Sequence, residues 1–334
     1  MRTICVNAPG GLENISIAEI EEPCVGPGQV LIQVRYGACN WGDVQKRQGI
    51  YPDPQTYPLF LGGEGSGIVL SADKGVSGFE PGQAVAFVSG ADMLRAFAEK
   101  VAVDARLVMP LPASVDLRRA AAIPVAALTA FHLLHTAHRV RRGETILVHA
   151  ISGSVGLALT QLAREAGATV YGTVGSADKI ARAKAFGAKM VVARDRDDFV
   201  ERVLAQTGGK GVDLVVDSLG ADILERSFET LRPFGRLINI GEAAGEPDFP
   251  IRKTLYKRST SMAGFELMHA ALLPGRWRRG LAHVSAALAE GRFDMPIAAE
   301  FEFHEAARAQ AFLESRRSIG KVILRVAGEP RQGV

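Results

Sequence analysis

The chain has 334 residues, and its 39 basic and 36 acidic side chains leave a formal net charge of +3. One hydrophobic core stops growing below this length, so two domains are expected, and 47% apolar with 22% charged residues is ordinary for a globular protein. The balanced charge argues against nucleic-acid binding, and the longest apolar stretch, residues 120–131, is too short to span a bilayer.

The first third of the chain predicts an irregular all-β module. Over residues 1–110, short β-branched runs alternate with glycine and proline turns. Residues 1–9 alternate like a strand and lack both a basic leader and an apolar signal core, which favours a cytoplasmic protein. A short helix is expected over residues 40–47, with Asn40 suited to its N-cap.

From about residue 120 the pattern changes to helix-length segments that alternate with compact apolar strands. This alternation predicts an α/β domain with a doubly wound parallel sheet covered on both faces. We expect this domain over residues 123–266, with residues 1–122 and 267–334 forming a discontinuous second domain. The predicted strands of the sheet are residues 145–149, 169–173, 190–193, 214–217 and 237–240.

A glycine turn follows the first of these strands. The strand runs through His149 into Ala150-Ile151-Ser152-Gly153-Ser154-Val155-Gly156 and then into an amphipathic helix. Gly153 lets a pyrophosphate approach the backbone, Gly156 lets the helix pack tightly, and the helix start offers free N–H groups and a positive dipole end. The complete strand, turn and helix favour a dinucleotide site over the alternative of a structural turn, with contacts from Ser152, Gly153, Ser154, Val155 and Gly156.

The end of the second strand indicates which dinucleotide binds. An NAD-binding unit normally has an acid there, about 20 residues after the turn, which accepts both ribose hydroxyls. Residues 172–176 read Gly-Thr-Val-Gly-Ser, and no acid occurs before Asp178. Ser176, Lys179 and Arg194 could instead bind a 2′-phosphate, although each basic side chain could equally be an ordinary surface charge. NADPH is therefore expected in preference to NADH.

With these motifs the chain resembles the medium-chain dehydrogenase/reductase superfamily, and within it the zinc-independent quinone oxidoreductases that include zeta-crystallin. The resemblance covers nearly the whole chain and implies a Rossmann domain with a chaperonin-10-like (GroES-like) irregular β-barrel catalytic domain split around it, and an active site in the cleft between them. It rests on Gly37-Ala38-Cys39-Asn40-Trp41-Gly42-Asp43, Leu61-Gly62-Gly63-Glu64-Gly65-Ser66-Gly67, Leu128-Thr129-Ala130, the segment 148–156, residues 172–176 and Glu314-Ser315-Arg316.

The resemblance also implies site residues. In the family the asparagine of the first motif and the threonine of the helix before the glycine turn lie beside the nicotinamide, which carries over to Asn40 and Thr129. The tyrosine after the first motif lies near cofactor and substrate, which carries over to Tyr51. Looser assignments add cofactor contacts at Gly241, Phe265 and Leu267.

A metal is not expected at this site. Zinc alcohol dehydrogenases of the superfamily use a cysteine in the first motif, a histidine before the glutamate of a GHE motif, and a third cysteine or acid. Here Gly63 replaces the histidine, residues 120–131 contain neither cysteine nor acid, and Asn40 aligns with the metal-binding cysteine. Cys39 and Glu64 alone are fewer than the roughly three protein ligands of a catalytic zinc. Glu64 is instead expected to be a structural carboxylate paired with a base or an amide.

The expected activity is a zinc-free transfer of hydride from NADPH to a quinone or an α,β-unsaturated carbonyl. Asn40 would orient the ring or carbonyl, and Tyr51 or water would assist protonation. Many family members have a second tyrosine where this chain has Gln45, so the acceptor stays open. Two alternatives remain, an enoyl-thioester reductase and a crystallin-like protein that binds NADPH with little turnover. The expected partners are a small-molecule acceptor and, as the resemblance implies, further copies of the chain in a homodimer or homotetramer.

Overall fold

A computed structural model describes residues 1–112 and 115–326. The chain divides into two compact units, each of which has its own sheets. One unit comprises Met1–Leu128 together with the chain from Leu281 on, and the other comprises Thr129–Gly280. None of the helices in the described parts of the chain is long and apolar enough to cross a membrane.

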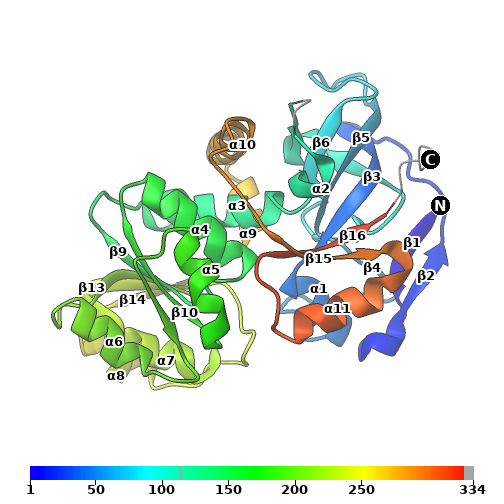
Figure 1. Ribbon diagram of the computed structural model, residues 1–334. Coiled ribbons are helices and arrows are strands. Elements are labelled where there is room, and N and C mark those ends of the chain that lie inside the picture. Colours follow the sequence, from blue (N-terminus) through cyan, green and yellow to red (C-terminus); the bar gives the residue numbers. More distant parts are fainter. Residues whose placement is uncertain (113–114, 327–334) are drawn as a thin grey trace. The chain divides into compact units, whose positions relative to one another are not determined.

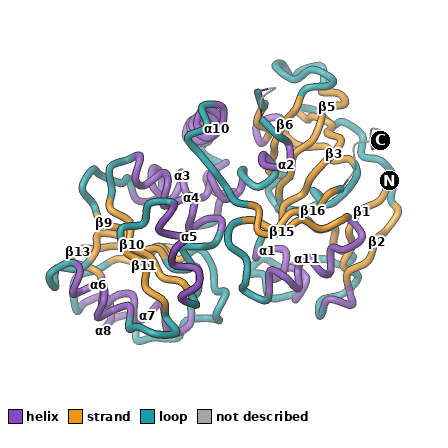
Figure 2. The backbone as a smooth tube through the Cα atoms, in the orientation of Figure 1, coloured by secondary structure: helices purple, strands orange, loops and turns teal. Residues whose placement is uncertain are grey.

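The first unit consists mainly of strands (Figure 2), and most of its strand pairs are antiparallel. Its larger sheet has the order β15-β16-β3-β5-β6-β8, with β7 also paired to β3, and its smaller sheet has the order β2-β1-β4. The strands are β1 (Arg2–Val6), β2 (Ile15–Glu19), β3 (Gln29–Cys39), β4 (Leu59–Phe60), β5 (Glu64–Ala72), β6 (Ala84–Val88), β7 (Lys100–Asp104), β8 (Val108–Pro110), β15 (Ile297–Glu302) and β16 (Lys321–Arg325).

Strand β3 organises this unit because it pairs with three others. Its first half pairs with β7, its second half pairs with β16, and β5 runs along its other edge. The register that joins Cys39 to Val322 brings the start of β16 beside the end of β3. Two parts of the chain that are almost 300 residues apart in the sequence thus meet at one point.

Helix α1 (Trp41–Gln48) follows β3 directly, and it starts where the sequence predicts. Asn40 occupies the N-cap position, and the Asp43 carboxylate accepts a hydrogen bond of 2.7 Å from the backbone N–H of Asn40. The helix ends at Gly49, whose positive φ of 77° is easily adopted by glycine. The other helices of this unit are α2 (Leu117–Ala120) and α11 (Ala306–Glu314).

The second unit contains a parallel sheet with the order β11-β10-β9-β12-β13-β14 (Figure 1). The order reverses between β9 and β12, as in doubly wound dinucleotide-binding domains, which confirms the predicted fold class. The four-residue strand β14 has no predicted counterpart, because it carries little apolar signal. The strands are β9 (Thr145–Val148), β10 (Thr169–Val174), β11 (Met190–Ala193), β12 (Val212–Asp217), β13 (Leu231–Asn239) and β14 (Ser261–Gly264).

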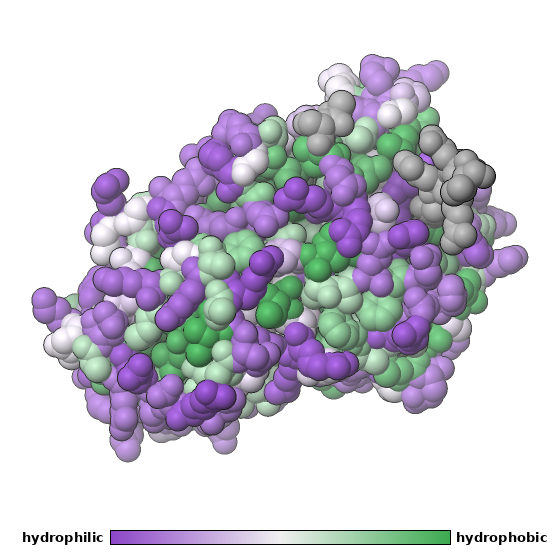
Figure 3. Space-filling view, viewed as in Figure 1, coloured by the Kyte–Doolittle hydropathy of each residue, from purple (hydrophilic) through white to green (hydrophobic). Residues whose placement is uncertain are grey.

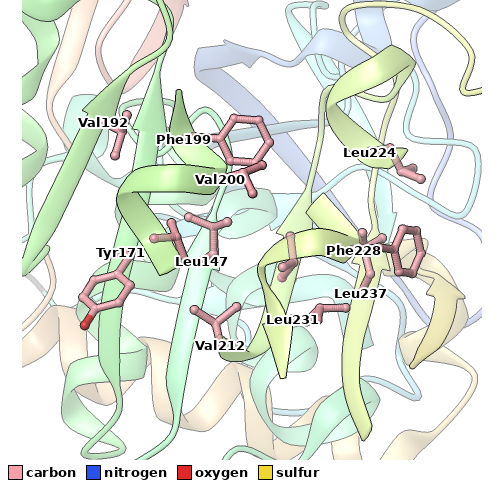
Figure 4. Packing of buried hydrophobic residues seen from close by; sticks show 12 residues of the cluster. Leu147, Tyr171, Val192, Phe199, Val200, Val212, Leu224, Phe228, Leu231 and Leu237 are labelled. Atoms are coloured by element: carbon pink, nitrogen blue, oxygen red, sulfur yellow. The ribbon is translucent and has the colours of Figure 1, made fainter. Parts of the chain in front are cut away.

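Helices cover both faces of this sheet. Side chains of α6 and α7 pack over Leu147 of β9 and its neighbours (Figure 4). The adjacent residues Ile146 and Val148 point to the opposite face and are also buried. The helices of the second unit are α4 (Ser154–Glu165), α5 (Ile180–Ala185), α6 (Phe199–Gln206), α7 (Ala221–Thr230), α8 (Ile251–Tyr256) and α9 (Leu267–Ala271), and α3 (Pro124–His132) and α10 (Pro274–Ala289) contain the points where the chain passes between units.

The surface fits the balanced composition. On the face drawn in Figure 3, hydrophilic residues are spread widely and hydrophobic residues form separate small areas between them. Such scattered apolar exposure is normal for a globular protein and indicates no interaction by itself.

Candidate active site

The glycine turn lies at the carboxyl edge of the parallel sheet, between β9 and α4. Gly153 is the N-cap of α4, and Ser154 is its first residue. The first N–H groups of a helix have no acceptor within it, so this end of α4 can bind an anion. A β-carbon added at Gly156 would lie 2.6 Å from the backbone Cα and O of Ile151, whereas one added at Gly153 would meet only the Ala150 carbonyl oxygen, at 3.2 Å, among the described atoms. Gly156 therefore serves close packing, and Gly153 leaves space for a ligand.

The predicted 2′-phosphate residues meet at the neighbouring strand ends. Val174 of β10 pairs with Ala193 of β11, so Arg194 follows directly beside the end of β10. Lys179 is only 9% exposed, and its pKa is lowered chiefly by burial and further by the charge of Arg194, while Asp178 opposes both. Ser176 donates a hydrogen bond to the Asp178 carboxylate and contributes to its lowered pKa. A phosphate bound by these two cations would offset the repulsion between their charges.

A buried hydrogen-bond chain, which the sequence analysis did not identify, supports Arg194. Its Nη1 donates to Thr173 Oγ1 at 2.7 Å, and Thr173 Oγ1 lies 2.9 Å from His149 Nδ1. His149 Nε2 lies 2.7 Å from Ser227 Oγ, which itself donates to the Ile223 carbonyl. Burial, and secondarily Arg194, lowers the pKa of His149 to about 3. The imidazole is therefore neutral, and the neighbouring donors and acceptors assign its proton to Nε2.

The remaining predicted cofactor residues of this unit lie mostly along the same edge. The Asn239 side chain donates to the Gly241 carbonyl at 2.9 Å, and the Phe265 N–H donates to the Asn239 carbonyl at 3.0 Å. Leu267 begins α9, two residues later. Thr129 is buried in α3, and no side-chain hydrogen bond joins it to these strand ends within the described residues.

In the first unit, the half-buried Asn40 belongs to a closed ring of polar groups with the buried Glu64 and Lys321. Its Nδ2 donates to Glu64 Oε1 at 3.0 Å, and its Oδ1 accepts from Lys321 Nζ at 2.6 Å. Lys321 Nζ also lies 2.5 Å from Glu64 Oε1, with both side chains at most 2% exposed. Glu64 Oε2 accepts from the N–H of Val125 at 2.7 Å. Glu64 is thus paired with a base and with amides, as the sequence analysis expects.

Lys321 is the residue of this ring that the sequence analysis did not identify. It precedes the buried apolar residues Val322, Ile323 and Leu324, and a lysine at the start of so apolar a strand is the one available signal. That signal does not indicate which side chains Lys321 contacts. The partner follows from the pairing of β16 with the end of β3.

The surroundings of Asn40 are buried and ordered. Asp43 accepts from the Asn40 N–H and, at 3.3 Å, from the Gly62 N–H. Burial raises the pKa of Asp43 to about 6, against the opposing effect of the Asn40 hydrogen bond and of nearby lysines. Burial also raises the pKa of the Cys39 thiol, so this cysteine stays protonated and unreactive.

Tyr51 lies near the first turn of α1. A β-carbon added at Gly42 would lie 3.5 Å from Tyr51 Cε2, and Lys46 Nζ lies 4.8 Å from the centre of the Tyr51 ring. Lys46 is buried and also donates to the Met93 carbonyl at 3.2 Å. Asn40 and Tyr51 therefore flank the same end of α1. No group of three or more histidine, cysteine or acidic side chains in residues 1–112 and 115–326 is arranged to hold a metal ion.

Comparison with known proteins adds to this geometry. Residues 26–113 match the alcohol dehydrogenase GroES-like domain, and residues 154–286 match the zinc-binding dehydrogenase domain. The chain is 31% identical to a 2-haloacrylate reductase from a Burkholderia species, over 96% of this chain and 97% of that one. It is also 31% identical to a quinone oxidoreductase from Pseudomonas aeruginosa, over 95% and 97%.

Two further similarities concern the cofactor and the kinds of protein that contain a similar chain. The structure of an Escherichia coli quinone oxidoreductase complexed with NADPH matches with a TM-score of 0.91 and 29% identity, over 97% of this chain and all of that one. A subunit of the phenolphthiocerol/phthiocerol polyketide synthase from Mycobacterium tuberculosis is 31% identical over 96% of this chain. The chain spans only 14% of the length of that synthase polypeptide.

Proposed function

The chain belongs to the medium-chain dehydrogenase/reductase family, as predicted, and from that premise we propose that it is a zinc-independent, NADPH-dependent reductase of quinones or α,β-unsaturated carbonyls. The observation that carries the proposal is the pair of cations, Lys179 and Arg194, beside the glycine turn. The relatives named as a quinone oxidoreductase and a 2-haloacrylate reductase support the acceptor class. The neighbour complexed with NADPH supports the cofactor.

The donors of the second unit fit NADPH. The N-terminal turn of α4, with Ser152, Ser154 and Val155, would bind the pyrophosphate, and Lys179 with Arg194 would bind the 2′-phosphate. Gly241, Phe265 and Leu267, at the ends of β13 and β14, would line the site farther along the sheet edge, together with Thr129 of α3. When bound, the cofactor supplies the hydride, and the protein supplies binding and orientation.

Asn40 acts on the acceptor oxygen. One hydrogen of its amide is committed to Glu64 at 3.0 Å, while the other makes only a long contact of 3.3 Å with the Ala38 carbonyl. The second hydrogen is the replaceable one, and it donates to the carbonyl or quinone oxygen as negative charge develops there. Tyr51, held over Lys46, supplies the proton that completes the product.

The same ring of residues supports zinc independence, even though one matching domain bears the name of a zinc-binding family. The ammonium of Lys321 already lies 2.5 Å from Glu64, the acid that accepts a hydrogen bond from the Asn40 side chain. A cation so placed opposes a metal ion at that carboxylate. Activity should persist after dialysis against a chelator, and purified protein should contain far less than one zinc per chain by elemental analysis. Loss of activity that added zinc restores would contradict this part of the proposal.

The proposed activity is tested by following NADPH oxidation with simple quinones and with α,β-unsaturated carbonyls. Asn40→Ala should lower kcat with either acceptor class, whereas a variant at the exposed Lys184 should match the wild type. Tight NADPH binding without oxidation across the whole panel would refute the proposal and favour the crystallin-like alternative.

A second candidate, an enoyl-thioester reductase, is favoured by the match with the polyketide synthase. The same site would reduce an activated double bond whose carbonyl belongs to a thioester. Comparing kcat/KM for enoyl-coenzyme A thioesters with the values for quinones separates the two, because a site shaped for thioesters should prefer them strongly.

Three finer expectations complete the proposal. They are a dinucleotide-binding domain over residues 123–266, a homodimer or homotetramer, and a cytoplasmic location. Sedimentation velocity measures the oligomeric state directly, and a monomer at micromolar concentration would contradict the expected homodimer or homotetramer.

A further inference from the structure

We propose that Lys321 and Glu64 are positioning residues that hold the amide of Asn40 in one orientation and polarise it as a hydrogen-bond donor. The inference rests on the proposed function, because it assigns a task to residues around the proposed catalytic amide. It goes beyond that function by giving a role to an ion pair that does not itself touch cofactor or acceptor.

The closed ring determines which way the amide faces. Asn40 Oδ1 lies 2.6 Å from the Lys321 ammonium, and Asn40 Nδ2 lies 3.0 Å from the Glu64 carboxylate. Turning the amide over would place its NH2 group against the ammonium and its oxygen against the carboxylate. Both contacts would then be repulsive, so the chemistry of the ring permits a single orientation.

The ring is also anchored from outside. The second carboxylate oxygen of Glu64 accepts from the backbone N–H of Val125, and Lys321 is fixed by the pairing of β16 with β3. The Asn40 backbone is held by Asp43 at the start of α1. Rotation of the Asn40 side chain would leave a buried charge without its amide partner, which is strongly unfavourable.

This arrangement makes Asn40 a better donor than a free amide. An ammonium on the amide oxygen draws electron density from the nitrogen, and hydrogen bonds in such a chain strengthen one another. The hydrogen that contacts the Ala38 carbonyl at 3.3 Å is therefore held in a fixed direction, from which it would donate to the acceptor. A donor fixed before the reaction has no reorganisation to undergo as charge develops on the acceptor.

A double-mutant cycle tests the inference. The main variant is the double substitution Lys321→Met with Glu64→Gln, which removes both charges together and so leaves no unpaired buried ion. It is combined with Asn40→Ala, and the matched control is Lys100→Met with Glu22→Gln, an ion pair of 2.5 Å in the same unit. Lys321→Arg serves as the conservative variant, because it keeps a donor to Asn40 Oδ1 and the charge on Glu64.

In the wild-type background the main variant should lower kcat by about tenfold or more, with the Kd for NADPH within about twofold. In the Asn40→Ala background the same change should alter kcat by less than about twofold, because the amide it positions is gone. Lys321→Arg should recover much of the loss, and the control pair should leave kcat unchanged. Equal losses of kcat in both backgrounds, or a wild-type kcat in the main variant, would overturn the inference.

A measurement on the amide itself keeps the inference separate from the proposed function. With asparagine labelled by 15N, the side-chain NH2 protons of Asn40 should give signals that exchange slowly with solvent in the wild type and much faster in the main variant. If the wild type oxidises no NADPH with any acceptor, the proposed function fails, while this signal still decides whether the pair fixes the amide. Signals unchanged by the double substitution would overturn the inference.

Discussion

Replacing Arg194 by glutamine should convert a preference for NADPH into indifference between NADPH and NADH. Arg194 lies beside the end of β10, where a ribose-binding acid is absent from residues 172–176. Glutamine removes the charge and is two bonds shorter than the guanidinium, whose Nη1 donates to Thr173 Oγ1 at 2.7 Å, so the variant loses both the charge and this hydrogen bond. Binding of NADH, which lacks the 2′-phosphate, measures the effect of the lost hydrogen bond to Thr173, and the remaining change in NADPH binding measures the contact with the 2′-phosphate.

The size of the effect follows from the kind of contact. A hydrogen bond between charged partners contributes about 1.5–3 kcal/mol, so loss of one should weaken NADPH binding about 10- to 100-fold. Lys179→Gln should cost less, about 1 kcal/mol, because it also removes a like charge from Arg194 in a buried place. NADH has no 2′-phosphate, so its Kd should change little in either variant.

Isothermal titration with both nucleotides measures these differences directly. Lys184→Gln is the matched control, since Lys184 is an exposed basic residue of the neighbouring helix α5. Raising the salt concentration should weaken NADPH binding to the wild type more than to Arg194→Gln. The reasoning fails if wild-type protein binds NADH as tightly as NADPH, or if Arg194→Gln weakens both nucleotides equally.

Other expected outcomes concern stability and catalysis. Burial lowers the pKa of His132 to about 4 in the folded protein. As the pH falls below about 6.5, His132 is therefore protonated in the unfolded chain but not in the folded one. The free energy of unfolding should then decrease by about 1.4 kcal/mol per pH unit until the pH reaches the pKa of the folded state. Urea denaturation should show that His132→Phe gains stability relative to the wild type as the pH falls through this range. Asp43, whose pKa is raised, changes stability with pH in the opposite direction, but it is present in both proteins and does not affect the difference between them. Gly156→Ala should cost about 1–3 kcal/mol from the clash with Ile151, seen as a lower Tm and weaker NADPH binding. Tyr51→Phe should lower kcat by at least about tenfold with KM nearly unchanged, and a wild-type kcat with an enone would show that water supplies the proton.

Local patterns were enough to predict much of this protein. Gly153 and Gly156 mark the turn because no other residue allows both a close ligand and a helix packed against Ile151. All strands of the parallel sheet except β14 stand out as apolar runs, and Asn40 marks the start of α1. Each of these signals lies within a few residues of the feature that it predicts, so it can be read without knowing the fold.

Contacts between residues that are far apart in the sequence could be identified only from the tertiary structure. Lys321 and Asn40 are 281 positions apart, and only the register of β16 on β3 joins them. The link from His149 to Ser227 spans 78 positions and depends on α7 packing against the sheet. A sequence shows that a lysine or a histidine is present, but whether it is buried, and which group then satisfies it, is decided by strand pairing and packing far along the chain.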